Sequence, residues 1–341
     1  MLKLANFFET IGLTWFSPPL KMLAGEDARY QGRRWLRMVG LPILAITISL
    51  VAWHGASKVI KIGNQTLPGP VEVTQAAGQI YANWRQAGVA YAEYQKSFAE
   101  AVTEYPEMST VEIRAIYPYT ATPTYVDQIW VSLVTVFTGF LIACAIAIPV
   151  GILCGMNQAI FEMVNPFIQI FKPVSPLAWL PICGIIIGAV MANPDPGAFI
   201  TKSYVISALV VCLCSLWPTL ISTANGVASV ERDHLNVARV LNLSWWSKVT
   251  KVVLPSAIPH IFGGMRMTLG VGWMVLIAAE MLSQNPGLGK FVWDMYQSSS
   301  DSTLAMIMVA VITVGFIGFL LDRLMIALQR LATPWNALAI R

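Results

Sequence analysis

Six apolar runs constrain this chain more than any other feature of its sequence. A transmembrane helix needs about 20 predominantly apolar residues. The runs that reach this length cover residues 38–57, 128–154, 164–192, 199–222, 261–283 and 303–329. Because lipid offers no partners for free backbone N–H and C=O groups, such runs must form helices. The sequence therefore predicts an all-α polytopic membrane protein with about six transmembrane helices.

Composition and the placement of arginines agree with this interpretation. Only 12% of the 341 residues are charged, whereas a soluble domain carries about 25%. The arginines gather before the first run and around the last one: Arg29, Arg33, Arg34, Arg37, Arg323, Arg330 and Arg341. Positive residues mark the cytoplasmic ends of membrane spans. This topology explains the arginines better than nucleic-acid binding, which needs a basic patch on a soluble face.

The order of the runs predicts the organisation of the chain. We expect a cytoplasmic segment over residues 1–37, a first transmembrane helix over 38–57 and a periplasmic loop over 58–127. A core of five transmembrane helices then covers 128–330, and a cytoplasmic tail covers 331–341. Six crossings return the C-terminus to the side of the N-terminus.

The loop over 58–127 contains a helical insert, because apolar and aromatic residues recur at helical spacing between Val71 and Tyr105. Two interpretations stay open. The insert either caps the outer mouth and receives a partner, or forms a helical hairpin with its own short core, which we favour.

Prolines interrupt the third run, so we expect a broken or kinked helix there. They are Pro166, Pro173, Pro176 and Pro181. Lys172 lies beside the interruption, and Ser175 follows it. A cation near a break in a span suits the passage of a small anion. The alternative is that Lys172 extends to the membrane interface.

Small residues repeat every four positions in the second and fifth runs. They are Gly139, Ala143, Ala147, Gly151 and Gly155 in the second run, and Gly264, Thr268 and Gly272 in the fifth. Such stripes allow close approach of helix backbones. We expect them to pack within a bundle or between two subunits.

Metal or cofactor chemistry has no support in the sequence. The five cysteines lie inside apolar runs without metal-finger spacing, and the three histidines are scattered. Cysteines in lipid usually act as small hydrophobes. We predict no metal and no cofactor in this chain.

A polar loop over 226–260 separates two apolar runs and carries four basic side chains, Arg232, Arg239, Lys248 and Lys251. A helix is predicted over 231–241, with Leu235, Ala238 and Leu241 on one side. Asn242 suits a left-handed helix end, and Ser244 suits the start of a second helix that leads to Pro255. The loop holds no phosphate-binding motif and no paired carboxylates, so it indicates docking rather than hydrolysis.

This loop resembles the "EAA" loop of the permease subunits of ABC-type importers. The similarity lies in Asn236-Val-Ala-Arg-Val-Leu-Asn242 and in Val253-Leu-Pro255. Asn236 replaces the family's Glu and removes a charge, and Asn242 replaces its Gly.

Further motifs resemble the nitrate/bicarbonate/cyanate branch of that family, and the taurine and aliphatic-sulfonate branch shares the architecture. The motifs span 173–181, 235–241, 278–282 and 287–294. The resemblance covers about residues 125–330.

The resemblance implies a type I ABC importer permease in the bacterial inner membrane, working as a homodimer. Cytoplasmic ATPases that bind ATP–Mg would dock beneath it, and a periplasmic or lipid-anchored binding protein would deliver substrate. The implied contacts to the ATPase form a coupling helix and its flanks: Asn236, Val237, Ala238, Arg239, Asn242, Leu243 and Pro255.

Charges within the spans are candidates for function. Glu280 could line the substrate pathway with Lys172 and Ser175. It could also pair with Lys290, cap the following turn or face the mouth of a cavity. We expect Arg266, Asp322 and Arg323 to anchor their spans near the headgroups.

These observations predict a permease for a small anion, with nitrate or nitrite first, bicarbonate or cyanate next, and sulfonates after them. The chain itself would be no enzyme. An ion-coupled secondary transporter is the alternative from another class, although it usually shows internal repeats and acidic groups at mid-membrane. A membrane enzyme would need a catalytic cluster.

Overall fold

The computed structural model describes residues 14–25, 27–62, 65–119, 122–191, 200–298 and 301–333. Parts of both expected cytoplasmic ends, 1–13 and 334–341, lie outside the described residues. The fold is helical, as expected.

Residues before the main bundle form a short helical cluster, one apolar helix and a long outer arm. These elements are η1 (Thr14–Phe16), α2 (Ser17–Leu23), α3 (Ala28–Trp35), η2 (Leu36–Gly40), α4 (Leu41–Val59), β1 (Lys61–Ile62), β2 (Gln65–Thr66), α5 (Pro70–Glu104) and α6 (Thr110–Ile116).

The bundle and its loops follow. Their elements are α7 (Tyr125–Met156), α8 (Gln158–Phe171), α9 (Pro176–Val190), α10 (Lys202–Ala228), α11 (Arg232–Val240), α12 (Trp245–Lys248), η3 (Val249–Val253), α13 (Leu254–Ser283), α14 (Leu288–Ser298) and α15 (Asp301–Ala332).

The described helices match the expected spans closely. Five are long and apolar enough to cross a membrane, and a sixth candidate is the pair α8 and α9. These two helices meet at an angle of 102°, as the prolines of the third run predict.

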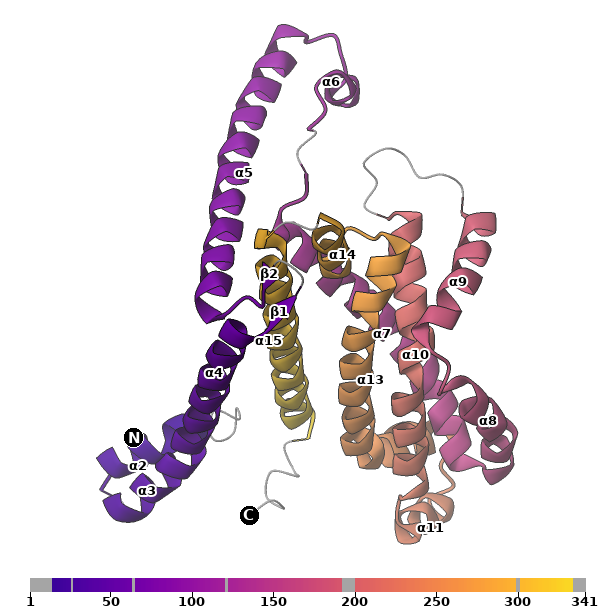
Figure 1. The fold of residues 1–341 in the computed structure, drawn as a ribbon. Helices are drawn as coiled ribbons and strands as arrows, with labels where there is room; N and C mark the ends of the chain where they lie inside the picture. The colour runs from indigo at the N-terminus through magenta and orange to yellow at the C-terminus, as the bar shows by residue number, and fades with distance from the viewer. Residues whose placement is uncertain are drawn as a thin grey trace.

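The centre of the bundle is α10, which packs between α7 and α13 (Figure 1). A Cβ added to Gly155 of α7 would lie 2.5 Å from the Ala224 carbonyl oxygen and from the Val227 Cβ. A Cβ on Gly264 of α13 would lie 2.7 Å from the Ser222 Cβ. The two small-residue stripes therefore pack within the bundle, both against α10.

The apolar helix α4 lies apart from this bundle. None of its most apolar stretch, within Ala28–Val59, is buried, and Figure 1 shows the helix beside the bundle rather than inside it. Its unburied surface must face lipid or another subunit.

The arm over 70–119 projects from one end of the bundle, opposite α11 (Figure 1). Only Val73, Ala76 and Ala101 are buried on the 35-residue helix α5. Near α6, the ring of Tyr94 lies 5.0 Å from that of Tyr119, and its hydroxyl donates to the Tyr117 carbonyl oxygen. The arm is thus an uneven hairpin closed by a small aromatic cluster.

One detail departs from the all-α expectation. A two-residue antiparallel pair joins Lys61 to Thr66 and Ile62 to Gln65. The Gly-Asn dipeptide at 63–64 is a hairpin signal in the sequence. The expectation of an all-α fold rested on the apolar runs and did not use this signal.

Candidate functional site

The predicted docking loop folds into α11 and a tight turn. Asn242 has φ 47°, in the left-handed region. Its N–H donates to the Arg239 carbonyl oxygen at 3.0 Å, and the Leu243 N–H donates to the Ala238 carbonyl oxygen at 3.1 Å. These two bonds form a Schellman motif, which satisfies the last carbonyls of the helix. The prediction of a left-handed helix end at Asn242 is confirmed.

The second helix begins where the sequence predicts it. The Ser244 hydroxyl accepts the Ser247 N–H at 3.3 Å, as an N-cap does. α12 and η3 then continue into α13, in which Pro255 is the second residue and is half-buried.

Helix α11 presents apolar side chains at the surface. Ala238 is buried, but Val237 is 58%, Val240 80% and Leu241 64% exposed. Leu241, which the sequence places on the same side of the helix as Ala238, is thus exposed whereas Ala238 is buried. α11 thus carries three exposed apolar side chains beside polar ones.

The other predicted docking residues surround this surface. Asn236, Arg239 and Asn242 are exposed, and Leu243 is half-buried. Beneath α11, a groove of about 320 Å³ is bounded by Ala238 and Leu243 on one side and by η3 and the first turn of α13 on the other.

Lys172 and Ser175 lie at the break between α8 and α9. Lys172 follows the last residue of α8 and is exposed. The Ser175 hydroxyl accepts the Leu177 N–H at 3.3 Å and so caps α9. The ring of Phe171 lies 5.7 Å from that of Trp179 and 6.5 Å from that of Trp217, next to the break.

Glu280 is fully buried near the outer end of α13. Its carboxylate accepts the Ser132 hydroxyl of α7 at 2.8 Å and the Gly289 N–H at 3.0 Å. Of the roles that the sequence left open for Glu280, the structure shows the cap on the turn that follows α13. Lys290 pairs with Asp294 instead, at 2.7 Å. The geometry thus ties α7 to the α13–α14 connection, and it gives Glu280 no exposed surface.

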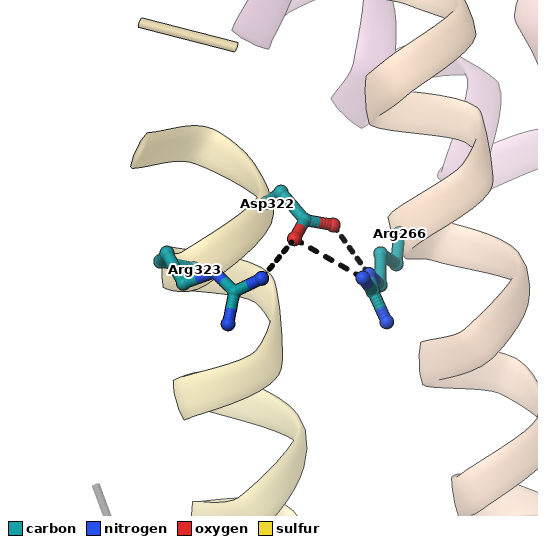
Figure 2. Close-up of polar contacts among 3 residues, drawn as sticks. All are labelled: Arg266, Asp322 and Arg323. Carbon is teal, nitrogen blue, oxygen red and sulfur yellow. Dashed lines mark hydrogen bonds and ion pairs between the residues drawn. The ribbon is translucent and has the colours of Figure 1, made fainter. Parts of the chain in front are cut away.

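Sequence reasoning missed a charge cluster between α13 and α15. The Arg266 Nε lies 2.5 Å from the Asp322 Oδ1, and its Nη2 lies 3.1 Å from Oδ2. The Arg323 Nη2 approaches the same carboxylate at 3.5 Å. Figure 2 shows the two guanidinium groups on either side of Asp322. We expected three separate anchors, because the sequence shows the opposite charges but not that α13 and α15 are neighbours.

Within the described residues, no group of three or more His, Cys, Asp or Glu side chains has the geometry of a metal site.

The comparisons with known proteins agree with one another. The family model for the inner membrane component of binding-protein-dependent transport systems matches residues 147–333. The nitrate import permease protein NrtB of Synechococcus elongatus is 35% identical over 61% of this chain and 70% of the relative. The bicarbonate transport system permease protein CmpB of the same organism is 42% identical over 58% of this chain and 66% of the relative, just under two thirds.

Two more comparisons extend the similarity. A probable ABC transporter permease protein of Brucella abortus is 28% identical over 87% of this chain and 96% of the relative. Among solved structures, a chain of the inward-facing MetNI methionine ABC transporter has a TM-score of 0.50 at 16% identity, covering 61% of this chain and 96% of that one. This structural likeness concerns the fold alone.

Proposed function

The chain belongs to the family of binding-protein-dependent transport system inner membrane components, the permease subunits of ABC importers, and we propose that it carries a small inorganic anion across the bacterial inner membrane. Nitrate or nitrite is the first candidate, since NrtB carries nitrate in its name, and bicarbonate, as for CmpB, is the second. Cyanate and sulfonates follow. ATP–Mg would be bound and hydrolysed by partner ATPases.

The exposed apolar surface of α11 carries the proposal that this permease works through a docked partner. Val237, Val240 and Leu241 would be costly to leave in water in a monomer. The Schellman turn holds α11 at a fixed angle to α12, η3 and α13, so a push on α11 reaches a span directly. We propose that α11 is the coupling helix and that Asn236, Arg239 and Asn242 rim its contact with the ATPase.

A matched pair of valines tests this docking surface. Val237 is 58% exposed on α11, and Val89 is 62% exposed on the outer arm. Val237→Asp would place an unpaired carboxylate in the contact and weaken it by about 3 kcal/mol, roughly a hundredfold. We expect Val237→Asp to abolish co-purification with the ATPase, and Val89→Asp to leave it intact. Retained binding by Val237→Asp would refute the assignment.

The substrate is tested by ATP-driven uptake in proteoliposomes that contain this permease, its ATPase and its binding protein. We expect uptake of labelled nitrate that persists in excess bicarbonate, cyanate and taurine. Uptake blocked by one competitor would reassign the substrate to it. An intact complex with ATPase activity but no anion uptake would contradict the anion proposal.

We further propose that two copies of the chain form the pathway and that both termini lie in the cytoplasm. The unburied apolar surface of α4 and the basic ends of the chain support these two statements. Cysteine labelling from each side of the membrane and cross-linking between copies would test them.

Lys172 and Ser175 remain candidates for the pathway, because the break exposes a cation and the N-terminus of α9. Lys172→Ala should slow anion flux without disturbing assembly. Lys58→Ala, at the exposed end of α4, is the matched control. Unchanged flux in Lys172→Ala would exclude this role.

A further inference from the structure

We infer that the cleft between α13 and α15 is a binding site for a planar oxyanion, with Arg266 as its cationic contact and Asp322 as a built-in competitor. The inference rests on the proposed function, since it takes the transported anion as the ligand. It assigns that anion a place in the chain distinct from the break at Lys172.

The charge cluster lies inside the spans rather than at their ends. Arg266 is the sixth residue of the apolar run 261–283, and Asp322 is the eighth residue from the end of the run 303–329, so both lie about one to two helical turns inside their spans. Charged groups at such depth face a bundle interior or a water-filled cavity, and they mark pathways for ions and substrates.

Contacts within one subunit do not enclose these charges. The side chains of Arg266, Asp322 and Arg323 are 43%, 31% and 51% exposed. Lipid tails cannot solvate them, so this face of α13 and α15 must meet water, headgroups or a second subunit. We take this face to line the pathway, because the proposed function requires a water-filled route for the anion.

The cluster has an excess of one positive charge. Two guanidinium groups share the single carboxylate of Asp322, and Arg323 also lies over the Phe319 ring at 5.0 Å. Among the described side chains, the contacts of this cluster add no second carboxylate. An incoming anion therefore meets a net cation.

The cleft beside the cluster has room for a small ligand. Its volume is about 240 Å³, several times the roughly 30 Å³ share of one water in the liquid. Gly270 and Gly318 line it from the two helices. A Cβ on Gly270 would meet no atom within 4 Å, while one on Gly318 would lie 3.1 Å from the Trp273 Cδ1. The Trp273 indole N–H donates to the Val314 carbonyl oxygen at 2.9 Å, which fixes the ring as one wall.

The guanidinium geometry selects the class of ligand. Arg266 already holds two carboxylate oxygens side by side, through Nε and Nη2. Nitrate and bicarbonate present the same planar pair of oxygens, which matches the fork of an arginine. Asp322 competes for that fork, so binding stays weak enough for the anion to leave, as conduction requires.

Direct binding can be measured as broadening of the NMR signal of labelled nitrate by the permease–ATPase complex in phosphatidylcholine nanodiscs at fixed ionic strength. We expect Arg266→Gln to weaken binding about tenfold or more and Asp322→Asn to strengthen it. Arg85→Gln on the outer arm removes the same charge elsewhere and should change nothing.

The double variant Arg266→Gln/Asp322→Asn separates a binding site from a structural ion pair. It removes both charges and leaves the helices neutral. If Arg266 contacts the anion, the double variant binds as poorly as Arg266→Gln alone. Recovery of wild-type binding would overturn the inference, because Arg266 would then serve only to neutralise Asp322.

Further outcomes distinguish lipid phosphate from nitrate as the ligand, and they separate failure of the binding site from failure of the proposed function. Loss of nitrate broadening when phosphatidylglycerol is added at constant ionic strength would assign the cluster to lipid phosphate and overturn the inference. If binding depends on Arg266 but the complex shows no ATP-driven nitrate uptake, the proposed function is contradicted and the inference of a binding site still stands. If the Arg266→Gln variant takes up nitrate normally, the inference of a binding site is overturned and the proposed function still stands.

Discussion

Helices α7 and α4 are both long and apolar, yet only α7 is buried in the bundle. In α7, 44% of the most apolar stretch is buried inside the bundle, whereas none is buried in the helix that contains α4. The difference lies in side-chain size: α7 carries a stripe of Gly and Ala toward α10, and α4 presents Ile43, Leu44 and Ile48 outward. Apolarity puts a helix in the membrane, and small residues decide whether it packs there.

The largest expected effect compares one glycine from each helix. Gly155→Val would drive side-chain atoms into Ala224 and Val227, whereas the Cβ position of Gly55 in α4 has no neighbour within 4 Å. Overpacking typically costs about 1–3 kcal/mol and occasionally more, and the 2.5 Å approach to a backbone oxygen puts Gly155→Val at the upper end. Gly155→Val should therefore lose most folded protein and Gly55→Val should lose little. Yield of monodisperse protein in detergent and the thermal midpoint measure this. Equal losses of folded protein in the two variants would contradict the difference in packing between α7 and α4.

The next comparison removes one large side chain from each region. Leu276 is fully buried in α13, and Ile48 is 59% exposed on α4. Leu276→Ala should destabilise the protein by about 2–5 kcal/mol through its cavity, and Ile48→Ala by about 0.5 kcal/mol or less. Denaturant titration in mixed micelles gives both values; a cost for Ile48 close to that for Leu276 would mean that α4 packs after all.

The buried carboxylate of the bundle ranks next. Glu280→Leu leaves the Ser132 hydroxyl and the Gly289 N–H without their acceptor, at about 1–3 kcal/mol for each unsatisfied group. Glu280→Gln keeps one acceptor oxygen and should cost about half as much. Thermal midpoints rank the two variants, and identical midpoints would show that these hydrogen bonds contribute nothing.

The smallest effect belongs to α11, which has few packing partners and depends on its own turn. Asn242→Ala must hold φ 47° at a cost of about 1 kcal/mol or somewhat more, while Asn242→Gly relieves that strain. Hydrogen exchange at the amides of Asn242 and Leu243 should rise several-fold in the alanine variant only. Faster exchange in the glycine variant as well would contradict the conformational explanation.

The features that could be predicted from the sequence depend on residues that are close together in the chain. Helical runs, the proline break after Lys172 and the left-handed turn at Asn242 depend on neighbours in the chain, and the structure has each of them. The fold class and the ABC importer permease family are likewise confirmed.

What escaped prediction depends on residues far apart in sequence. The partner of Glu280 is Ser132 on α7, and that of Arg266 is Asp322 on α15. Neither pair can be inferred without knowing which spans are neighbours, because helix periodicity fixes a face but not the helix opposite it. The docking roles of Val237 and Ala238 remain predictions.

The isolation of α4 bears on how the protein is made. A span with few tertiary contacts can form as soon as it leaves the ribosome, since a transmembrane helix satisfies all of its own backbone hydrogen bonds. The first span usually fixes orientation in the membrane, and four arginines precede this one. The chain can therefore settle its topology during synthesis, before α10 exists to organise the bundle around itself.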